Sequence, residues 1–135
     1  MTKTNFLAIG DTVVDAFIKI TNAEVHEDAN GENKTICMPF AEKVPFEFAV
    51  EIPGVGNSAN AAVAASRLGL SSALLSGLGA DDNGKKCLDQ LIGDKVDVSE
   101  VTSVPGKVTN YHYVLWFESE RTILIKHEVF EYHVP

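Results

Sequence analysis

A glycine-rich turn that leads into an alanine-rich helix restricts the fold of this chain more than any other feature of its sequence. The turn reads Gly-Val-Gly-Asn-Ser-Ala-Asn over residues 54–60, and a run of small residues with high helix propensity follows it. We predict a helix over residues 57–68, capped by Asn57 or Ser58 and followed by Gly69. Because small side chains let a helix lie close against a sheet, this pattern indicates a layered domain.

Short apolar runs and helical patterns alternate around this turn. The predicted elements are strands at Phe6–Ile9 and Ser72–Ser76 and a second helix from Asp82 to about Ile92, with Val96 and Val101 in the connection that follows. Alternating strands and helices favour an α/β fold with a parallel sheet and flanking helices. We assign residues 1–15 and 54–105 to this core.

The remaining apolar stretches do not alternate with helices. The predicted strands of this group span residues 16–20, 35–40, 46–52, 108–117 and 122–125, and residues 21–34 are expected to form a polar loop. Between Phe46 and Glu51, large apolar residues alternate with smaller or charged ones, which is typical of a half-exposed antiparallel strand. We expect one small antiparallel β lid assembled from two distant segments, residues 16–53 and 106–126.

The turn itself has the chemistry of a binding site. Backbone N–H groups at the positive end of a helix, together with the amides of Asn57 and Asn60, suit a phosphate or a polyhydroxylated ligand. A plain glycine turn with an Asn cap is an equally good interpretation of these residues alone. The pattern Gly-x-Gly-x-x-Ala also fits a dinucleotide fingerprint. Its late position in the chain and the absence of an acidic residue at the end of the next strand count against that interpretation.

Composition and charge exclude some classes of partner. The chain has 45% hydrophobic and 22% charged residues and a formal net charge of −8, and no basic run is longer than Lys85-Lys86. This argues against nucleic acid and against an anionic membrane surface. Cys37 and Cys87 form no C-x-x-C motif, and the apolar run at Phe6–Ile9 is too short for a signal or a membrane span. We expect two buried thiols and a cytoplasmic protein.

The ordered motifs resemble a known family. Residues 56–69, followed by residues 77–84, are similar to the N-terminal signature of the ribokinase-like (PfkB) carbohydrate kinases: a Gly-rich Asn turn, an Ala-rich helix ending in Arg-Leu-Gly, and a Gly-x-Asp-x-x-Gly stretch. Residues 9–15 resemble the first strand of that family. Thr109 and residues 120–124 resemble its lid.

The resemblance implies a sugar-binding site, with substrate-binding positions at Asp15, Gly56, Asn57, Asn60, Asn110 and His112. Asp15 would accept hydrogen bonds from two sugar hydroxyls, since a carboxylate offers only acceptors. The Gly56 turn would hold the other side of the sugar. Asn110 and His112 would share one face of the closing lid strand with Val114.

Other polar residues near these motifs have simpler expected roles. Asp11 is expected to serve in a turn or a helix cap, and Asp81 and Asp82 to cap the second helix. The aromatic residues Tyr111, Tyr113 and Trp116 are expected to pack within the lid or against a second subunit.

The sequence departs from the family pattern in two places. Val55 replaces the second glycine that usually precedes the Asn turn, and the chain ends at Pro135 without a Gly-Ala-Gly-Asp motif. In the family, the ATP site, the anion hole and the catalytic Asp belong to a C-terminal half. We therefore expect no catalytic or metal-binding residue in this chain, and no ATP or Mg²⁺ bound by it alone.

The resemblance thus implies part of an ATP-dependent kinase that uses ATP and Mg²⁺ when complete and phosphorylates a hydroxyl of a small sugar or nucleoside. A homodimer formed through the lid is a further expectation. Two alternatives stay open at the level of sequence: part of a dinucleotide-binding oxidoreductase, and a non-catalytic sugar-binding or dimerisation module.

Overall fold

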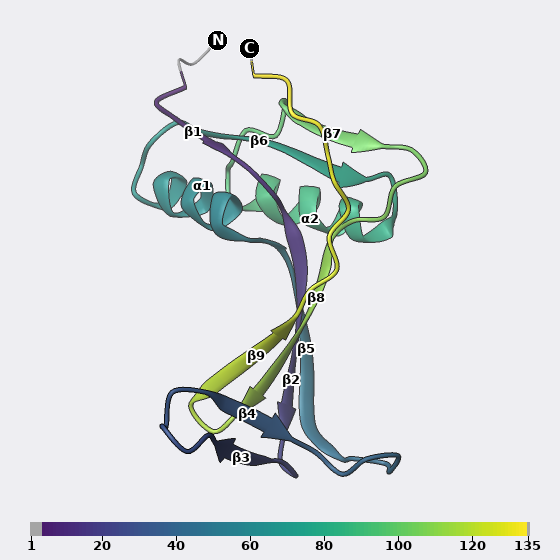
Figure 1. Cartoon of the computed structure of the whole chain (residues 1–135). Coiled ribbons are helices and arrows are strands. Elements are labelled where there is room, and N and C mark those ends of the chain that lie inside the picture. The colour runs from purple at the N-terminus through teal and green to yellow at the C-terminus, as the bar shows by residue number, and fades with distance from the viewer. Residues whose placement is uncertain (1–3, 135) are drawn as a thin grey trace.

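The chain folds into an α/β core and a β-sheet lid joined by a narrow stem (Figure 1). The computed structural model describes residues 4–134, so residues 1–3 of the expected core segment, and Pro135, lie outside the described part. The predicted α/β fold, with its parallel sheet and flanking helices, is confirmed.

The core contains a three-stranded parallel sheet in the order β1-β6-β7, formed by β1 (Phe6–Ile9), β6 (Ser72–Gly79) and β7 (Val101–Val104). The helices α1 (Asn57–Arg67) and α2 (Asp82–Gly93) cover one face of this sheet (Figure 1). Strand β6 is central and is buried at every residue. β7 is a strand where the sequence indicated only a connection, because its four residues pair with the end of β6 but carry no apolar run of their own.

Alanine residues allow the close packing of α1 against the sheet. Ala59 and Ala62 are fully buried and pack with Leu74 of β6 and Leu91 of α2. A larger side chain on this face of α1 would push the helix away from the strands. The helix was predicted from the same alanines, and its bounds differ from the prediction by one residue.

The caps of the two helices agree only in part with the prediction, which named Asn57 or Ser58 for the first helix and Asp81 and Asp82 for the second. The N-cap of α1 is Gly56, not Asn57 or Ser58, and no side chain caps this end. Ser58 Oγ instead donates to the backbone oxygen of Asp11, 2.7 Å away. In α2 the cap is Asp81 rather than Asp82, and its side chain accepts a hydrogen bond from Gly84 N.

The lid is a four-stranded sheet in the order β5-β2-β8-β9, formed by β2 (Val13–Ile20), β5 (Phe46–Val55), β8 (Tyr111–Phe117) and β9 (Glu120–Leu124). Its outer pairs are antiparallel, as expected, but the central pair β2–β8 is parallel. Both of these strands run from the core toward the far end of the lid, so they point the same way (Figure 1).

β2 and β5 extend furthest beyond their predicted limits. β2 begins at Val13 rather than Ala16, and β5 continues through Pro53 to Val55. A register shift between Val13 and Val14 accommodates Pro53, which β5 tolerates as an edge strand of the sheet.

The expected loop over residues 21–34 is partly wrong. It contains β3 (Glu24–Glu27), which pairs with β4 (Lys34–Cys37) in a separate antiparallel hairpin at the far end of the lid. Almost every side chain of this hairpin is exposed, so no apolar alternation marks it in the sequence. A tight turn holds it together, in which the Asp28 carboxylate accepts from Glu32 N and Asn33 Nδ2.

After β9 the chain turns back along the stem to the core. We call residues 125–134 the returning segment. Phe130 on this segment is buried, and its side chain lies so close to Gly77 of β6 that a Cβ at Gly77 would be 2.4 Å from the Cβ of Phe130. The returning segment is therefore packed against the core (Figure 1).

The two cysteines differ from the expectation of two buried thiols. Cys87 is buried, and burial raises the pKa of its thiol to about 11, while Cys37 lies exposed on β4. Neither helix of the described chain is long and apolar enough to cross a membrane.

Candidate functional site

Asp15 lies in the stem, at the point where β2 leaves the core. It is paired with Ile52 of β5 and with His112 of β8. Its side chain is 22% exposed, and its Oδ1 atom is buried without a hydrogen-bond partner among the described residues. Since a buried carboxylate oxygen without a donor is costly, this atom is suited to accept a hydrogen bond from a ligand.

Alternation along β2 explains why the carboxylate lies where it does. The neighbours of Asp15, Val14 and Ala16, are buried on the opposite face of the strand. Val14 packs there with Leu78 and Cys87 of the core. Asp15 therefore has to point to the other face, where His112 lies beside it.

The glycine turn meets the start of β2 at this point. Val55 pairs with Val13, and Gly56 has a φ of 113°, in the left-handed region that favours glycine. A Cβ at Gly56 would be 2.9 Å from the backbone oxygen of Asp11. The backbone of the turn thus lies directly against the link between β1 and β2.

Asn57 and Asn60 lie in the first turn of α1, and both are exposed. Neither side-chain amide is hydrogen-bonded to another residue in the described part of the chain. The first turn of α1 also carries no acidic side chain. Both amides and the positive end of the helix are available to a ligand approaching the Gly56 turn.

Asn110 has a different environment from the other predicted positions. It precedes β8, is only 2% exposed, and its backbone oxygen accepts from Val14 N. Its side-chain Oδ1 accepts from Glu128 N at 2.6 Å, and its Nδ2 donates weakly to Glu128 O at 3.5 Å. The amide of Asn110 is thus used to hold the returning segment.

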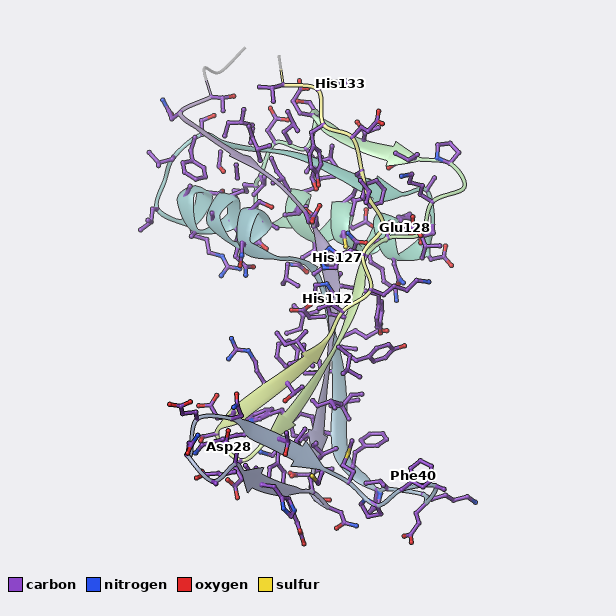
Figure 2. All side chains as sticks on the ribbon, in the orientation of Figure 1. Asp28, Phe40, His112, His127, Glu128 and His133 are labelled. Atoms are coloured by element: carbon purple, nitrogen blue, oxygen red, sulfur yellow. The ribbon has the colours of Figure 1, made fainter. Side chains whose placement is uncertain are left out.

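His112 connects Asp15 to the returning segment. Its Nδ1 lies 3.2 Å from Asp15 Oδ1, but the two atoms form no hydrogen bond of good geometry. On the other side of the ring, its Nε2 lies 2.9 Å from Nε2 of His127. Figure 2 shows the two imidazoles together in the stem, one on β8 and one on the returning segment. Nδ1 of His127 lies 3.5 Å from Asp11 Oδ2.

Tyr132 completes this group of polar side chains. Its hydroxyl donates to Asp11 Oδ1, and burial together with this hydrogen bond to Asp11 raises the pKa of Tyr132 well above its ordinary value. The sequence predicted only a turn or cap role for Asp11 and did not single out His127 or Tyr132. No periodic signal marks these two residues, because the returning segment is neither helix nor strand.

The five side chains form a line of contacts, not a convergent cage. They run in the order Asp15, His112, His127, Asp11 and Tyr132. Within residues 4–134, no group of three or more His, Cys, Asp or Glu side chains is arranged to hold a metal ion. The chemistry of the line is hydrogen bonding and the sharing of protons.

A second polar cluster anchors the base of β8 to the core. The carboxylate of Asp81 accepts from Gly84 N, from Thr109 N and from Thr109 Oγ1, and Gly79 N donates to the same Oγ1. Burial raises the pKa of Asp81, but the hydrogen bonds from Thr109 and Gly84 outweigh it and hold the pKa below its ordinary value of 3.8. This cluster fixes the position from which β8 reaches Asp15.

The more pronounced surface grooves lie elsewhere. One lies between the β3–β4 hairpin and the β8–β9 turn, where Lys34 and Arg121 line it, and another lies beside Tyr111 and Tyr113. Asp15 lines neither of them. The unpaired carboxylate and the glycine turn, not the depth of a pocket, identify the candidate site.

A family model described as pfkB family carbohydrate kinase matches residues 28–131. No curated protein matches the chain.

Several solved structures share the fold. A sugar kinase of Pyrococcus horikoshii in complex with ATP is 26% identical, with a TM-score of 0.64 over 92% of this chain and 34% of that one. A ribokinase of Arabidopsis thaliana complexed with ribose and ATP is 20% identical, with a TM-score of 0.69 over 93% of this chain and 36% of that one. A nucleoside kinase of Methanocaldococcus jannaschii is 20% identical, with a TM-score of 0.65 over 90% of this chain and 36% of that one. The chain thus spans about a third of the length of each of these structures.

Proposed function

The chain belongs to the PfkB family of carbohydrate kinases, and from this we propose that it supplies the sugar-binding site and lid of an ATP-dependent kinase that phosphorylates a hydroxyl of a small sugar or nucleoside. The fold, shared with a ribokinase and a nucleoside kinase, supports the kinase class. The ligands named for those proteins were found in those proteins. For this chain they indicate only which class of substrate to test.

One observation carries the proposal: the buried, unpaired Oδ1 of Asp15 on β2, the strand whose first residue, Val13, pairs with Val55 of the glycine turn. A sugar hydroxyl that donates to this atom would supply the hydrogen bond that the carboxylate lacks. Because the neighbouring strands hold Asp15 on both sides, the acceptor is already in position before the ligand arrives.

We assign the other site residues by the groups they offer. Gly56 supplies close access to the backbone, and Asn57 and Asn60 supply amides that both donate to and accept from hydroxyls. His112 forms the wall beside Asp15. Asn110 takes part indirectly, because its amide holds Glu128 of the returning segment.

ATP use is proposed for the complete kinase. Solved relatives of this fold contain ATP, and in phosphoryl transfer Mg²⁺ neutralises the charge that develops on the phosphates. We assign no catalytic base and no ATP contact to residues 4–134. We therefore expect no phosphorylation of sugar by this chain alone, and a cytoplasmic location, where ATP is available, stays a prediction.

The lid offers a surface for a second subunit. One face of the sheet carries Phe48, Val50 and Ile52 on β5, Trp116 on β8 and Ile123 on β9, all of them exposed. Trp116 packs edge-on against Phe48 and under the ammonium group of Lys19, which places them on the same face. An exposed apolar face of this kind supports the proposal of a homodimer formed through the lid.

The dinucleotide interpretation of the glycine turn has less support. The turn follows β5 of the lid sheet, whereas β1 of the parallel sheet leads into β2 and not into a helix. A dinucleotide fingerprint normally joins the first strand of the parallel sheet to its helix.

A thermal-shift titration tests the proposal directly. Ribose, fructose, adenosine and NAD are titrated separately into the 135-residue chain. We expect at least one of the sugars or the nucleoside to raise Tm in a saturable way and NAD to have no effect. A saturable increase with NAD alone would support the oxidoreductase alternative and contradict the proposal.

A further inference from the structure

The line of contacts from Asp15 to Asp11 contains two imidazoles whose hydrogens can be counted. Nε2 of His112 and Nε2 of His127 lie 2.9 Å apart, a distance that needs one hydrogen between the two atoms. With no hydrogen, two lone pairs would face each other, and with two hydrogens, two N–H groups would collide. The contact between the rings therefore requires one shared hydrogen.

The two remaining ring nitrogens both face carboxylates. Nδ1 of His112 lies 3.2 Å from Asp15 Oδ1, and Nδ1 of His127 lies 3.5 Å from Asp11 Oδ2. Carboxylates only accept, so each Nδ1 is stabilised by carrying a hydrogen. Three hydrogens on four ring nitrogens satisfy every contact, and the pair then holds one proton more than two neutral imidazoles.

From this arrangement we infer that His127 is a positioning residue for sugar binding. Through the contact between the two Nε2 atoms it holds the His112 ring in the orientation that places Nδ1 3.2 Å from Asp15 Oδ1, and so it fixes the wall beside the carboxylate that accepts the sugar hydroxyl. The inference rests on the proposed function of Asp15. It adds a residue of the returning segment to the site, although that residue does not touch Asp15.

The returning segment is held firmly enough for this role. Phe130 is buried against Gly77, the Tyr132 hydroxyl donates to Asp11, and Asn110 holds the backbone of Glu128, the residue after His127. The ammonium group of Lys107 also donates to the backbone oxygen of Val129. These contacts all involve residues 128–132, so they fix the backbone that directly follows His127.

Charged and polar groups surround the pair. They are Asp15 on β2, Asp11 on the link between β1 and β2, and Glu128 and Tyr132 on the returning segment.

Nuclear magnetic resonance of the imidazole nitrogens tests the arrangement without any sugar. In long-range ¹H–¹⁵N spectra of the 135-residue chain near neutral pH, we expect a hydrogen on Nδ1 of both His112 and His127. A His112 ring with its hydrogen on Nε2 and a bare Nδ1 would overturn the inference, whatever the chain binds.

Binding measurements test the consequence. By isothermal titration calorimetry with the sugar that gives the largest thermal shift, His127→Phe is expected to bind about tenfold more weakly than the wild type, as for loss of an outer-shell partner. His127→Gln is expected to bind within about threefold of the wild type, because the Gln amide can donate to His112.

The controls separate this inference from the proposed function. His133→Gln changes an exposed histidine of the same segment at the core end, far from the pair (Figure 2), and should bind like the wild type. Loss of binding in Asp15→Asn combined with wild-type binding of His127→Phe would overturn the inference alone. If the wild type binds no sugar, the proposed function fails, and the nitrogen spectra still decide the arrangement of the histidines.

Discussion

Asp15 gives the stem its binding chemistry because strand pairing holds its carboxylate in place on both sides while leaving one oxygen without a donor. Few buried polar atoms in folded proteins lack a partner, and those that do are often completed by a ligand. The residues around it contribute shape and backbone donors more than charge.

Replacing Asp15 by Asn should weaken sugar binding by about 10- to 100-fold, since a hydrogen bond to a charged acceptor contributes roughly 1.5–3 kcal/mol. Calorimetric titration measures the change. Asp28→Asn is the matched control, because Asp28 is also a carboxylate in a hydrogen-bonded setting but lies at the far end of the lid (Figure 2). Equal losses in the two variants would contradict a specific role for Asp15.

Gly56 is predicted to tolerate no side chain. Its φ of 113° and the 2.9 Å separation of a Cβ from Asp11 O both oppose alanine, and strain of this kind costs about 1–3 kcal/mol. Gly69→Ala is the control, since its φ is 90° but a Cβ there meets nothing within 4 Å. Urea unfolding should show a larger loss of stability for Gly56→Ala than for Gly69→Ala. Equal losses would mean that the contact with Asp11 is unimportant.

At the scale of secondary-structure elements, β8 depends on its anchor at the base of the lid. Thr109 precedes the strand, and the Asp81 carboxylate binds both its backbone N–H and its hydroxyl. Since Asp81 also caps α2, one side chain couples the start of the lid strand to the start of a core helix.

Asp81→Asn is expected to lower the free energy of unfolding by about 1–2 kcal/mol at neutral pH, because the hydrogen bonds favour the ionised acceptor. The pKa of Asp81 is lowered in the folded state, so its stabilising effect is complete above pH 3.8 and is lost as the pH falls further, through the folded value. Unfolding curves between pH 2 and 7 should show this acid loss in the wild type and a smaller one in the variant.

Asp82→Asn serves as the control for this change, because Asp82 is exposed in the first turn of α2 and does not cap it. The same pH dependence in Asp81→Asn as in the wild type would contradict the account of the anchor.

Elements that form through local interactions could be predicted from the sequence. Those that depend on contacts between distant parts of the chain could not. α1, α2, β1 and β6 carry local signals, namely helix propensity and apolar runs bounded by glycine. β3 was missed because its exposed residues carry no apolar alternation, although a strand was predicted at residues 35–40, where β4 begins the return of the hairpin. The contact of Tyr132 with Asp11 spans 121 residues, and nothing local in an irregular segment points to it. Asp15 and His112 are paired in the stem, whereas the buried pairing of Asn110 with Glu128 depends on the same long-range return of the chain.

At the scale of the whole molecule, a compact core carries an extended lid whose apolar face is open (Figure 1). We expect the chain to form a dimer in sedimentation or light-scattering experiments through this face. Val50→Lys should shift the population to monomer, since a charge would be buried in the interface. Ala49→Lys adds the same charge to the adjacent residue on the opposite face and should leave the dimer intact. A wild type that is monomeric at all concentrations would rule out this interface.

The central claim is that the stem, where β2 meets the glycine turn, binds a polyhydroxylated ligand. Backbone amide chemical shifts, followed while the sugar or nucleoside with the largest thermal shift is titrated into the chain, test it most directly. We predict saturable changes centred on Asp15, Gly56, Asn57 and Asn60, with no change at Asp28 on the far hairpin. Changes confined to the lid grooves, with the amides of Asp15 and Gly56 unmoved at saturation, would contradict the account.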